Sequence, residues 1–291
     1  MHFVDSKGIL SAKNGMNIYR GCTHGCIYCD SRSDCYQMNH AFEDIEVKRN
    51  CVELLEKALQ SKRKKCMIGT GSMSDPYMHC EEKLELMKKC LEVIERYGFG
   101  AAVMTKSDRI LRDLPLLSRI NQKAKAVVQT TFTTYDESLC KILEPNVCTT
   151  KKRFEMLMAM KEAGIPTVVW LDPFLPFIND TKENLDGLLD YCIEAEVKGI
   201  ICFGIGMTLR NGNREYFYQK LDEYFPGLKR KYQETYGFAY ELESPNGRGI
   251  YNRLQDACKA HNILCNPDEV FTYINDFPYD KGYEQLSLFG N

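Results

Sequence analysis

The chain has 291 residues, and its 38 Lys and Arg residues nearly balance its 40 Asp and Glu residues, which leaves a formal charge of −2. Hydrophobic residues make up 44% of the chain and charged residues 27%, which excludes a disordered, collagen-like or coiled-coil protein. The low net charge argues against attraction of nucleic acid by the whole surface, but a local basic groove is compatible with it.

Neither a membrane segment nor a secretion signal is evident in the sequence. No apolar run approaches the roughly 18–20 residues that a bilayer-spanning helix needs. The first residues, MHFVDSKGILSAKNG, lack a basic segment followed by an apolar one. We therefore expect a cytoplasmic protein. In that compartment its 14 cysteines indicate metal binding or catalysis rather than disulfides, with core positions expected for Cys51, Cys90, Cys192 and Cys258.

Short β-like runs alternate with longer helical patterns along most of the chain. Strands are predicted at residues 15–21, 66–71, 100–106, 126–132, 166–173 and 198–206. Helices are predicted at residues 51–64, 81–97, 151–163, 181–196 and 213–233, where apolar residues recur at spacings of three and four. Such alternation predicts an α/β fold of parallel βαβ units, wound into an open sheet or a partial barrel.

Beyond residue 235 the pattern changes to a strand-like, turn-rich stretch followed by a short helix at 250–261. Because no Pro-, Gly- or Ser-rich linker divides the chain, we predict one core domain at residues 1–206. Residues 207–282 are predicted to form a C-terminal extension that closes the barrel, and residues 283–291 a flexible tail.

Cys22, Cys26 and Cys29 follow the first predicted strand directly, at C-x3-C-x2-C spacing. A structural zinc site and a conventional [4Fe–4S] centre each use four protein ligands. Three thiolates therefore indicate a cluster with one iron left open to a ligand. The alternative is a zinc knuckle completed by one of three further side chains: Cys35, His24 or His40.

This triplet, with the aromatic Tyr28 before its last cysteine, resembles the radical S-adenosylmethionine (SAM) superfamily. The resemblance implies a partial (βα)6 TIM-type barrel with parallel strands, in which Cys22, Cys26 and Cys29 hold a [4Fe–4S] cluster. It also implies that SAM binds the open iron beside Tyr28 and is cleaved by one electron to methionine and a 5′-deoxyadenosyl radical. An electron donor such as flavodoxin or ferredoxin would then be a partner.

The residues at the ends of the later predicted strands indicate which branch of the superfamily the sequence resembles. The stretches SDPY, TKS, TTFTTYDESLCKILEP and PFLPFIND together look like the spore photoproduct lyase-like branch, over residues 14–206. The resemblance implies SAM contacts from Ser72, Ser74, Asp75, Lys106, Thr131 and Thr133. Without that context, Lys106 could be a solvated surface residue and the threonines ordinary β-branched strand residues.

One position departs from that branch. Spore photoproduct lyases carry a hydrogen-donating cysteine at the end of the second strand, where this chain has Ser72. A serine O–H bond is too strong to quench a carbon radical. Either another thiol donates the hydrogen atom, the candidates being Cys35, Cys66 and Cys80, or the reaction differs.

The segment QLSLF near the end of the sequence resembles the bacterial sliding-clamp binding motif. Its apolar anchors suit a pocket and its glutamine can form directional hydrogen bonds. The residues concerned are Gln285, Leu286, Ser287, Leu288 and Phe289. The alternative is that the segment packs on its own domain.

Basic clusters at 62–65, 151–153 and 229–231 could contact phosphates, but each also suits a solvated helix end. The aromatic-rich stretch 216–236 could stack bases, although core packing is the simpler interpretation. The sequence thus predicts a radical SAM enzyme that acts on a DNA lesion and docks on the sliding clamp. The alternatives are an RNA, peptide or metabolite substrate, or a metal-stabilised clamp-binding module without catalysis.

Overall fold

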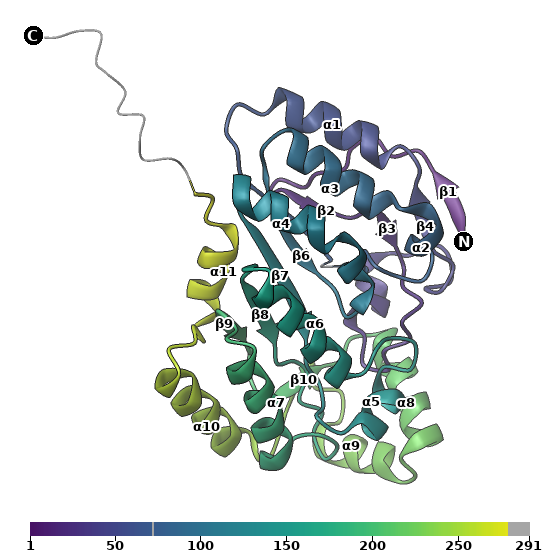
Figure 1. Ribbon diagram of the computed structural model, residues 1–291. Helices are drawn as coiled ribbons and strands as arrows, with labels where there is room; N and C mark the ends of the chain where they lie inside the picture. Colours follow the sequence, from purple (N-terminus) through teal and green to yellow (C-terminus); the bar gives the residue numbers. More distant parts are fainter. Residues whose placement is uncertain (72, 279–291) are drawn as a thin grey trace, which may run out of the picture.

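A parallel sheet forms the centre of the protein in a computed structural model that describes residues 1–71 and 73–278 (Figure 1). The strand order is β2-β5-β6-β7-β8-β9, and each neighbouring pair is parallel. The strands are β2 (Gly15–Met16), β5 (Met67–Thr70), β6 (Gly100–Met104), β7 (Ala126–Thr131), β8 (Thr167–Trp170) and β9 (Gly199–Ile201). This confirms the predicted α/β fold with a partial TIM-type barrel.

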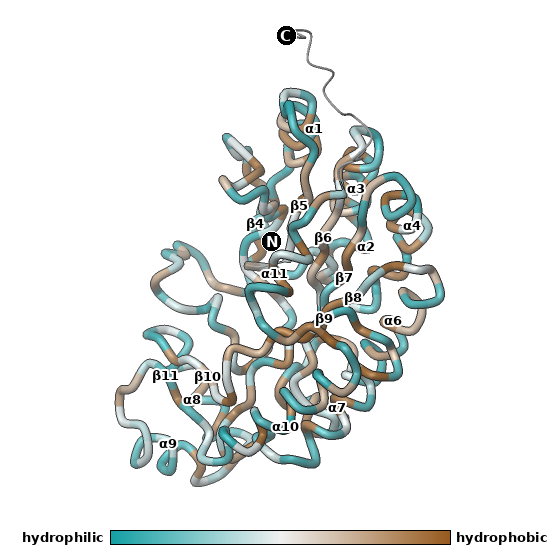
Figure 2. Tube along the Cα trace, turned by 90° about the vertical axis from the view of Figure 1, so that its left-hand side faces the viewer, coloured by the Kyte–Doolittle hydropathy of each residue, from teal (hydrophilic) through white to brown (hydrophobic). Residues whose placement is uncertain are grey.

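Helices between the strands cover one face of the sheet (Figure 1). They are α1 (Cys51–Ser61), α3 (Leu86–Arg96), α4 (Leu114–Lys123), α6 (Thr150–Glu162) and α7 (Lys182–Glu194). Every residue of β7 is buried, as expected of a central parallel strand enclosed on both faces. Hydropathy along the chain follows this arrangement, with hydrophobic segments at the central strands and hydrophilic ones on outer turns (Figure 2). The four cysteines predicted to be core residues are all buried.

Two predicted helices are broken in the structure. The 81–97 pattern splits into α2 (Glu81–Leu84) and α3, because Glu85 adopts a left-handed backbone with φ of 49°. The 213–233 pattern splits into α8 (Asn213–Tyr224) and α9 (Leu228–Tyr236). There Pro226 offers no N–H donor and Gly227 turns the chain at φ of 84°. The predictions also missed α4, α5 (Glu137–Leu143) and α11 (Pro267–Asn275).

The first predicted strand, 15–21, proves to be two strands in different sheets. Its beginning is β2, whereas its end is β3 (Tyr19–Arg20), which pairs antiparallel with β4 (Glu46–Lys48). β4 in turn pairs parallel with β1 (His2–Val4), giving a three-stranded side sheet of order β1-β4-β3. The chain therefore changes sheet just before the cysteine triplet.

After β9 the chain forms a further layer of secondary structure outside the six-stranded sheet. β10 (Gly206–Thr208) and β11 (Glu241–Glu243) form an antiparallel pair, followed by α10 (Gly247–Ala260) and α11. The two edges of the six-stranded sheet each carry a one-residue bridge, Leu264 beside Gly199 of β9 and Leu10 beside Met16 of β2. The division at residues 206 and 282 stays a prediction, and residues 283–291 lie outside the described residues.

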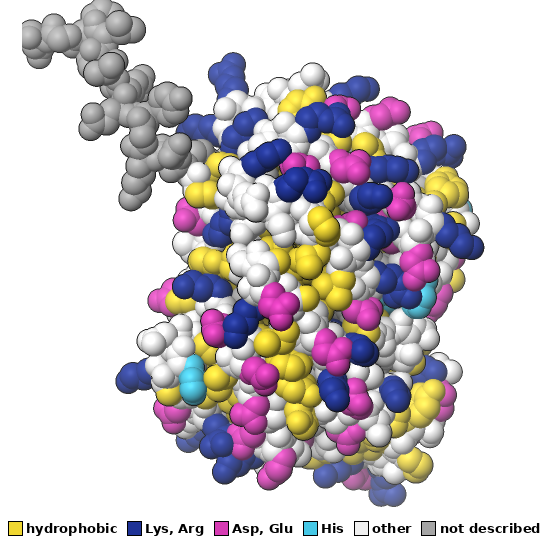
Figure 3. Space-filling view, in the orientation of Figure 1, with side chains coloured by type: hydrophobic (Ala, Val, Ile, Leu, Met, Phe, Trp, Pro, Cys, Tyr) yellow, Lys and Arg dark blue, Asp and Glu magenta, His cyan; other side chains and the backbone are white. Residues whose placement is uncertain are grey.

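Charged side chains of both signs are interspersed on the face drawn in Figure 3. The sequence analysis placed Arg153 in a basic cluster that could contact phosphates. That prediction is wrong for Arg153, because its side chain is fully buried. In the aromatic-rich stretch, Phe217, Tyr218 and Tyr232 are buried together, which confirms core packing for these three residues, whereas Tyr224 is exposed. In the described part of the chain, no helix is long and apolar enough to cross a membrane.

Candidate cofactor and substrate site

A cavity of about 1020 Å³ opens at the carboxyl ends of the parallel strands. In α/β folds this edge is where ligands bind, because loops from neighbouring strands converge there. The cysteine loop contributes Cys26, Tyr28 and Cys29 to its lining. The strand ends contribute Met104, Lys106, Thr131, Trp170 and Asp172, and the opposite wall comes from residues 203–208, 241–244, 247–248 and 251–252.

The three thiols of the cysteine loop lie beside this cavity without disulfides, with Cys26 buried and Cys22 and Cys29 half-buried. Within residues 1–71 and 73–278, only His2, His40 and Glu46 place three ligand atoms all within 4.8 Å of one another. The three thiols therefore do not form such a set. Three thiolates suit a cluster, in which each binds a different iron, better than a four-ligand zinc site.

Neither nearby histidine is grouped with the cysteine thiols in the described residues. His24 is buried, with its Nδ1 3.5 Å from Asp75 and its Nε2 without a hydrogen-bond partner, but it belongs to no set of three ligand atoms within 4.8 Å. His40 is grouped with His2 and Glu46 instead. Burial raises the pKa of Cys22 to about 12 and raises that of Cys26, so metal binding must release their protons. The donor set present thus fits a cluster held by three thiolates.

Tyr28 anchors the cysteine loop to the carboxyl end of the sheet. Its hydroxyl lies 3.0 Å from the Thr133 hydroxyl and donates to the buried carboxylate of Glu144. Glu144 is also paired with Arg153, and neither side chain is exposed to solvent. Arg153 in turn donates from Nη1 to the carbonyl of Thr131 at 2.7 Å. This network fixes the loop relative to the end of β7.

Electrostatics explain how the buried pair stays charged. Burial disfavours ionisation of Glu144, but Arg153 and Lys106 outweigh it and hold the pKa at about 2. Burial likewise disfavours the charge on Lys106, but the negative charges of a Cys26 thiolate and of the Glu144 carboxylate raise its pKa. The sequence analysis missed the pairing of Glu144 and Arg153. A signal was present, because Arg153 shares its helical face with the buried Met156, Leu157 and Met160.

The loop after β5 carries two predicted SAM contacts, but their hydrogen bonds are made within the protein. Asp75 accepts from the Thr105 hydroxyl at 2.6 Å and from the backbone N–H groups of Lys106 at 2.7 Å and Tyr77 at 2.8 Å. Ser74 donates to the carbonyl of Tyr19 at 2.7 Å. Both side chains lie behind the cavity lining, and Ser72 lies outside the described residues.

Three of the predicted SAM contacts, Tyr28, Lys106 and Thr131, do line the cavity, while Thr133 supports Tyr28 from behind. The Lys106 ammonium lies 5.9 Å from the centre of the Tyr28 ring. Asp172, which the sequence analysis did not single out, faces the same space from the end of β8. Burial raises its pKa to about 7, so its carboxyl group can carry a proton near neutrality.

Residues 16–216 match the profile of the Radical SAM superfamily, and this match spans the sheet and the cysteine loop. The chain belongs to the radical SAM superfamily. Radical SAM enzymes use a [4Fe–4S] cluster and SAM, which are accordingly the cofactors here.

Two relatives of this radical SAM protein are uncharacterized proteins. Rv2578c of Mycobacterium tuberculosis (strain ATCC 25618 / H37Rv) is 28% identical over 80% of this chain and 70% of its own length. MJ0683 of Methanocaldococcus jannaschii is 29% identical over 62% of this chain and 67% of its own length.

Solved structures show the same radical SAM fold. A spore photoproduct lyase variant superposes with a TM-score of 0.62 at 14% identity, covering 91% of this chain and 78% of that one. Another variant, solved with AdoMet and a dinucleoside spore photoproduct, gives a TM-score of 0.60 at 12% identity over 87% and 74%. SuiB of Streptococcus suis, bound to SAM, gives 0.51 at 13% over 87% and 49%. At these identities the likeness is one of fold.

None of the three hydrogen-donor candidates lines the cavity of this radical SAM protein. Cys66 precedes β5 and so lies at the amino-terminal ends of the strands, opposite the cavity, where its carbonyl accepts from the N–H of Gly100. Cys80 packs against the main core, and Cys35 is exposed beside Arg210. In the described residues the thiols that reach the cavity lining are Cys26 and Cys29.

Proposed function

We propose that this radical SAM enzyme acts on a damaged base in DNA, in a lyase-type repair reaction. The observation that carries the proposal is the aromatic rim of the cavity. Phe203 is 62% exposed at this rim, and its ring centre lies 5.9 Å from that of Trp170. The exposed Phe203 ring, beside the half-buried Trp170, offers a stacking surface for a base that enters the cavity from outside.

On the inner side, Cys22, Cys26 and Cys29 hold the cluster, and Tyr28 keeps their loop in place through Thr133 and Glu144. When bound, the cluster supplies the electron that cleaves SAM to a 5′-deoxyadenosyl radical, and a flavodoxin or ferredoxin supplies that electron to it. Lys106 provides a buried positive charge for the SAM carboxylate. Asp172, whose pKa burial raises to about 7, lines the same cavity.

Two further observations support a nucleic-acid substrate. The related fold of spore photoproduct lyase has been solved with a dinucleoside photoproduct. Arg248 of α10 lines the cavity and is exposed, so it can meet a phosphate at the entrance. Glu241 and Glu243 on the same wall would keep the backbone of the DNA away from β11 and leave the Arg248 side for it.

The test is an anaerobic turnover with reconstituted cluster, SAM and dithionite. UV-irradiated DNA is the substrate, unirradiated DNA is the matched control, and products are followed by mass spectrometry. We expect loss of a photoproduct and recovery of the normal bases, and no reaction with Cys26→Ala. Formation of 5′-deoxyadenosine with unchanged DNA would contradict the DNA substrate and redirect the search to RNA, peptides or metabolites. No cleavage of SAM by a fully loaded protein would favour a binding module instead.

We also propose that residues 285–289 dock the enzyme on the bacterial sliding clamp; this segment lies outside the described residues, so the proposal rests on the QLSLF sequence alone. A labelled peptide of residues 281–291 should bind the clamp at micromolar concentration, and the same peptide with Leu288→Ala and Phe289→Ala should not. Equal binding of both peptides, or of neither, would contradict delivery by the clamp without affecting the proposed chemistry.

A further inference from the structure

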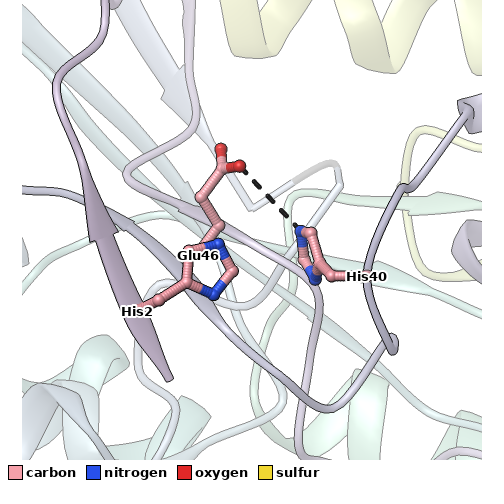
Figure 4. Close-up of side chains that lie close together, drawn as sticks. All are labelled: His2, His40 and Glu46. Atoms are coloured by element: carbon pink, nitrogen blue, oxygen red, sulfur yellow. Dashed lines mark ion pairs between the residues drawn. The ribbon is translucent and has the colours of Figure 1, made fainter.

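A second group of ligand-type side chains lies on the side sheet, apart from the cavity (Figure 4). His2 begins β1 and Glu46 begins β4, and the two residues are directly opposite in the parallel register. His40 points toward them from the loop that precedes β4 (Figure 4). Each of the three side chains offers a ligand atom, and these atoms all lie within 4.8 Å of one another.

Hydrogen bonds orient both imidazole rings. Nδ1 of His2 lies 2.9 Å from the Asp44 carboxylate, and Nδ1 of His40 lies 3.0 Å from the carbonyl of Ala41. Metal-binding histidines characteristically donate one ring N–H to a carboxylate or a backbone carbonyl, which fixes the ring and its tautomer. The arrangement leaves Nε2 of each ring as the available ligand atom.

The environment of the His40 ring favours the binding of an ion. Its Nε2 atom is buried and has no hydrogen-bond partner, although the side chain is 12% exposed overall. Oε2 of Glu46 lies 3.9 Å away, too far for a hydrogen bond. Two atoms that bind one zinc ion at about 2.0–2.2 Å are about 3–4 Å apart, so this separation suits two ligands of a shared ion.

We propose that His2, His40 and Glu46 bind a divalent transition-metal ion, with Zn²⁺ as the best match. Two imidazole nitrogens and one carboxylate oxygen favour zinc over Mg²⁺ or Ca²⁺, which prefer all-oxygen ligands. A fourth position is left for water. Asp44 acts behind His2 as an orienting carboxylate.

The position of this site gives it a structural role beside the cysteine loop. β3 leads directly into Cys22, and the chain runs from Cys29 through short 3-10 turns at Asp30–Arg32 and Asp34–Tyr36 to His40. The ion therefore joins β1 to the segment that leaves the cysteine loop and to the strand that pairs with β3. It closes a loop of the folded chain in the way a disulfide does, without using a thiol.

The test uses the full chain with its cluster reconstituted and without a polyhistidine tag. The protein is equilibrated with Zn²⁺ and desalted, its metal content is measured, and X-ray absorption at the zinc edge identifies the ligands. We expect one zinc per chain bound only by nitrogen and oxygen at about 2.0–2.2 Å. Zinc with sulfur ligands at about 2.3 Å would place the ion in the cysteine loop and overturn the proposal. Failure to retain zinc would overturn it too.

Variants then assign the ligands. His40→Gln and Glu46→Gln should each weaken zinc binding by about 100-fold or more, and Asp44→Asn by roughly 10- to 100-fold. His261→Gln, at an exposed histidine that follows the last residue of α10, is the matched control and should leave the affinity unchanged. Iron and sulfide content identifies any variant that fails to fold. Zinc should raise the melting temperature of the wild type but not of Glu46→Gln. Wild-type zinc affinity in folded His40→Gln would refute the assignment.

Discussion

The two walls of the cavity differ in whether nearby charged side chains are buried in a pair or exposed. On the strand-end wall, Glu144 and Arg153 are fully buried and paired with each other. On the wall built from β11 and α10, the charged side chains Glu241, Glu243 and Arg248 are exposed. The buried pair holds Tyr28 and the end of β7 in a fixed geometry, whereas the second wall presents exposed charged side chains. This contrast predicts that substitutions on the first wall alter stability and those on the second alter binding.

The largest effect is expected from Arg153→Leu. It leaves the Glu144 carboxylate buried without its partner, which should lower the free energy of unfolding by about 3–5 kcal/mol. The double variant Glu144→Leu/Arg153→Leu should recover much of this loss, because no isolated charge remains. Glu243→Gln on the opposite wall should change stability by less than about 0.5 kcal/mol. Urea unfolding measures all three, and a single variant as stable as wild type would contradict the contrast.

The next effect concerns pH. Because burial raises the pKa of Asp172 from 3.8 to about 7, the folded protein binds a proton there that the unfolded chain has released. This contribution to stability is present below about pH 4 and is lost as pH rises toward 7, by up to roughly 4 kcal/mol. Asp172→Asn should flatten this part of the stability profile, whereas Glu241→Gln should not. An unchanged profile in Asp172→Asn would show that the carboxyl group is ordinary.

A smaller effect is expected at the rim. Phe203→Ala removes the exposed ring beside Trp170 and should weaken binding of damaged DNA by about 1–3 kcal/mol, or roughly 5- to 150-fold in Kd. Phe238→Ala is the control, since Phe238 is 95% exposed and lies outside the cavity lining. Equal losses in both variants would mean that the rim has no special role.

The smallest effect is expected at Arg248. If this exposed side chain meets a phosphate, Arg248→Gln should reduce the salt dependence of DNA binding by about one unit of slope. Arg230→Gln serves as the control, because Arg230 already pairs with Glu234 at 2.7 Å. Binding isotherms at several salt concentrations compare the two, and an unchanged slope for Arg248→Gln would remove it from the DNA-binding surface.

Features encoded in local sequence could be predicted well. Five of the six parallel strands, β5 to β9, contain a short apolar run, and the three cysteines after residues 15–21 have a characteristic spacing, so both were visible before the structure. The helix break at Glu85 was harder to predict, because Glu85 adopts a left-handed backbone conformation that glutamate does not favour. The change of sheet between β2 and β3 depends on partners far along the chain, residues 67–70 and 46–48.

The supporting residues of the site could be predicted least. Arg153 was grouped with its basic neighbours, and only the tertiary pairing with Glu144 explains its burial. The raised pKa of Asp172 comes from burial, which the sequence cannot measure. His2 and Glu46 are brought together by strand register in the side sheet, so their spacing in the sequence does not predict that they lie side by side.

A barrel that does not close leaves two sheet edges exposed to other molecules, and each edge here is blocked by one residue. Leu264 accepts from the N–H of Ile200 at 2.7 Å and donates to the carbonyl of Lys198, while Leu10 bridges to Met16 at the other end. Unpaired edges are templates for edge-to-edge aggregation. The segment around Leu264 thus satisfies backbone groups of β9 that an open barrel would otherwise leave available for pairing with another chain.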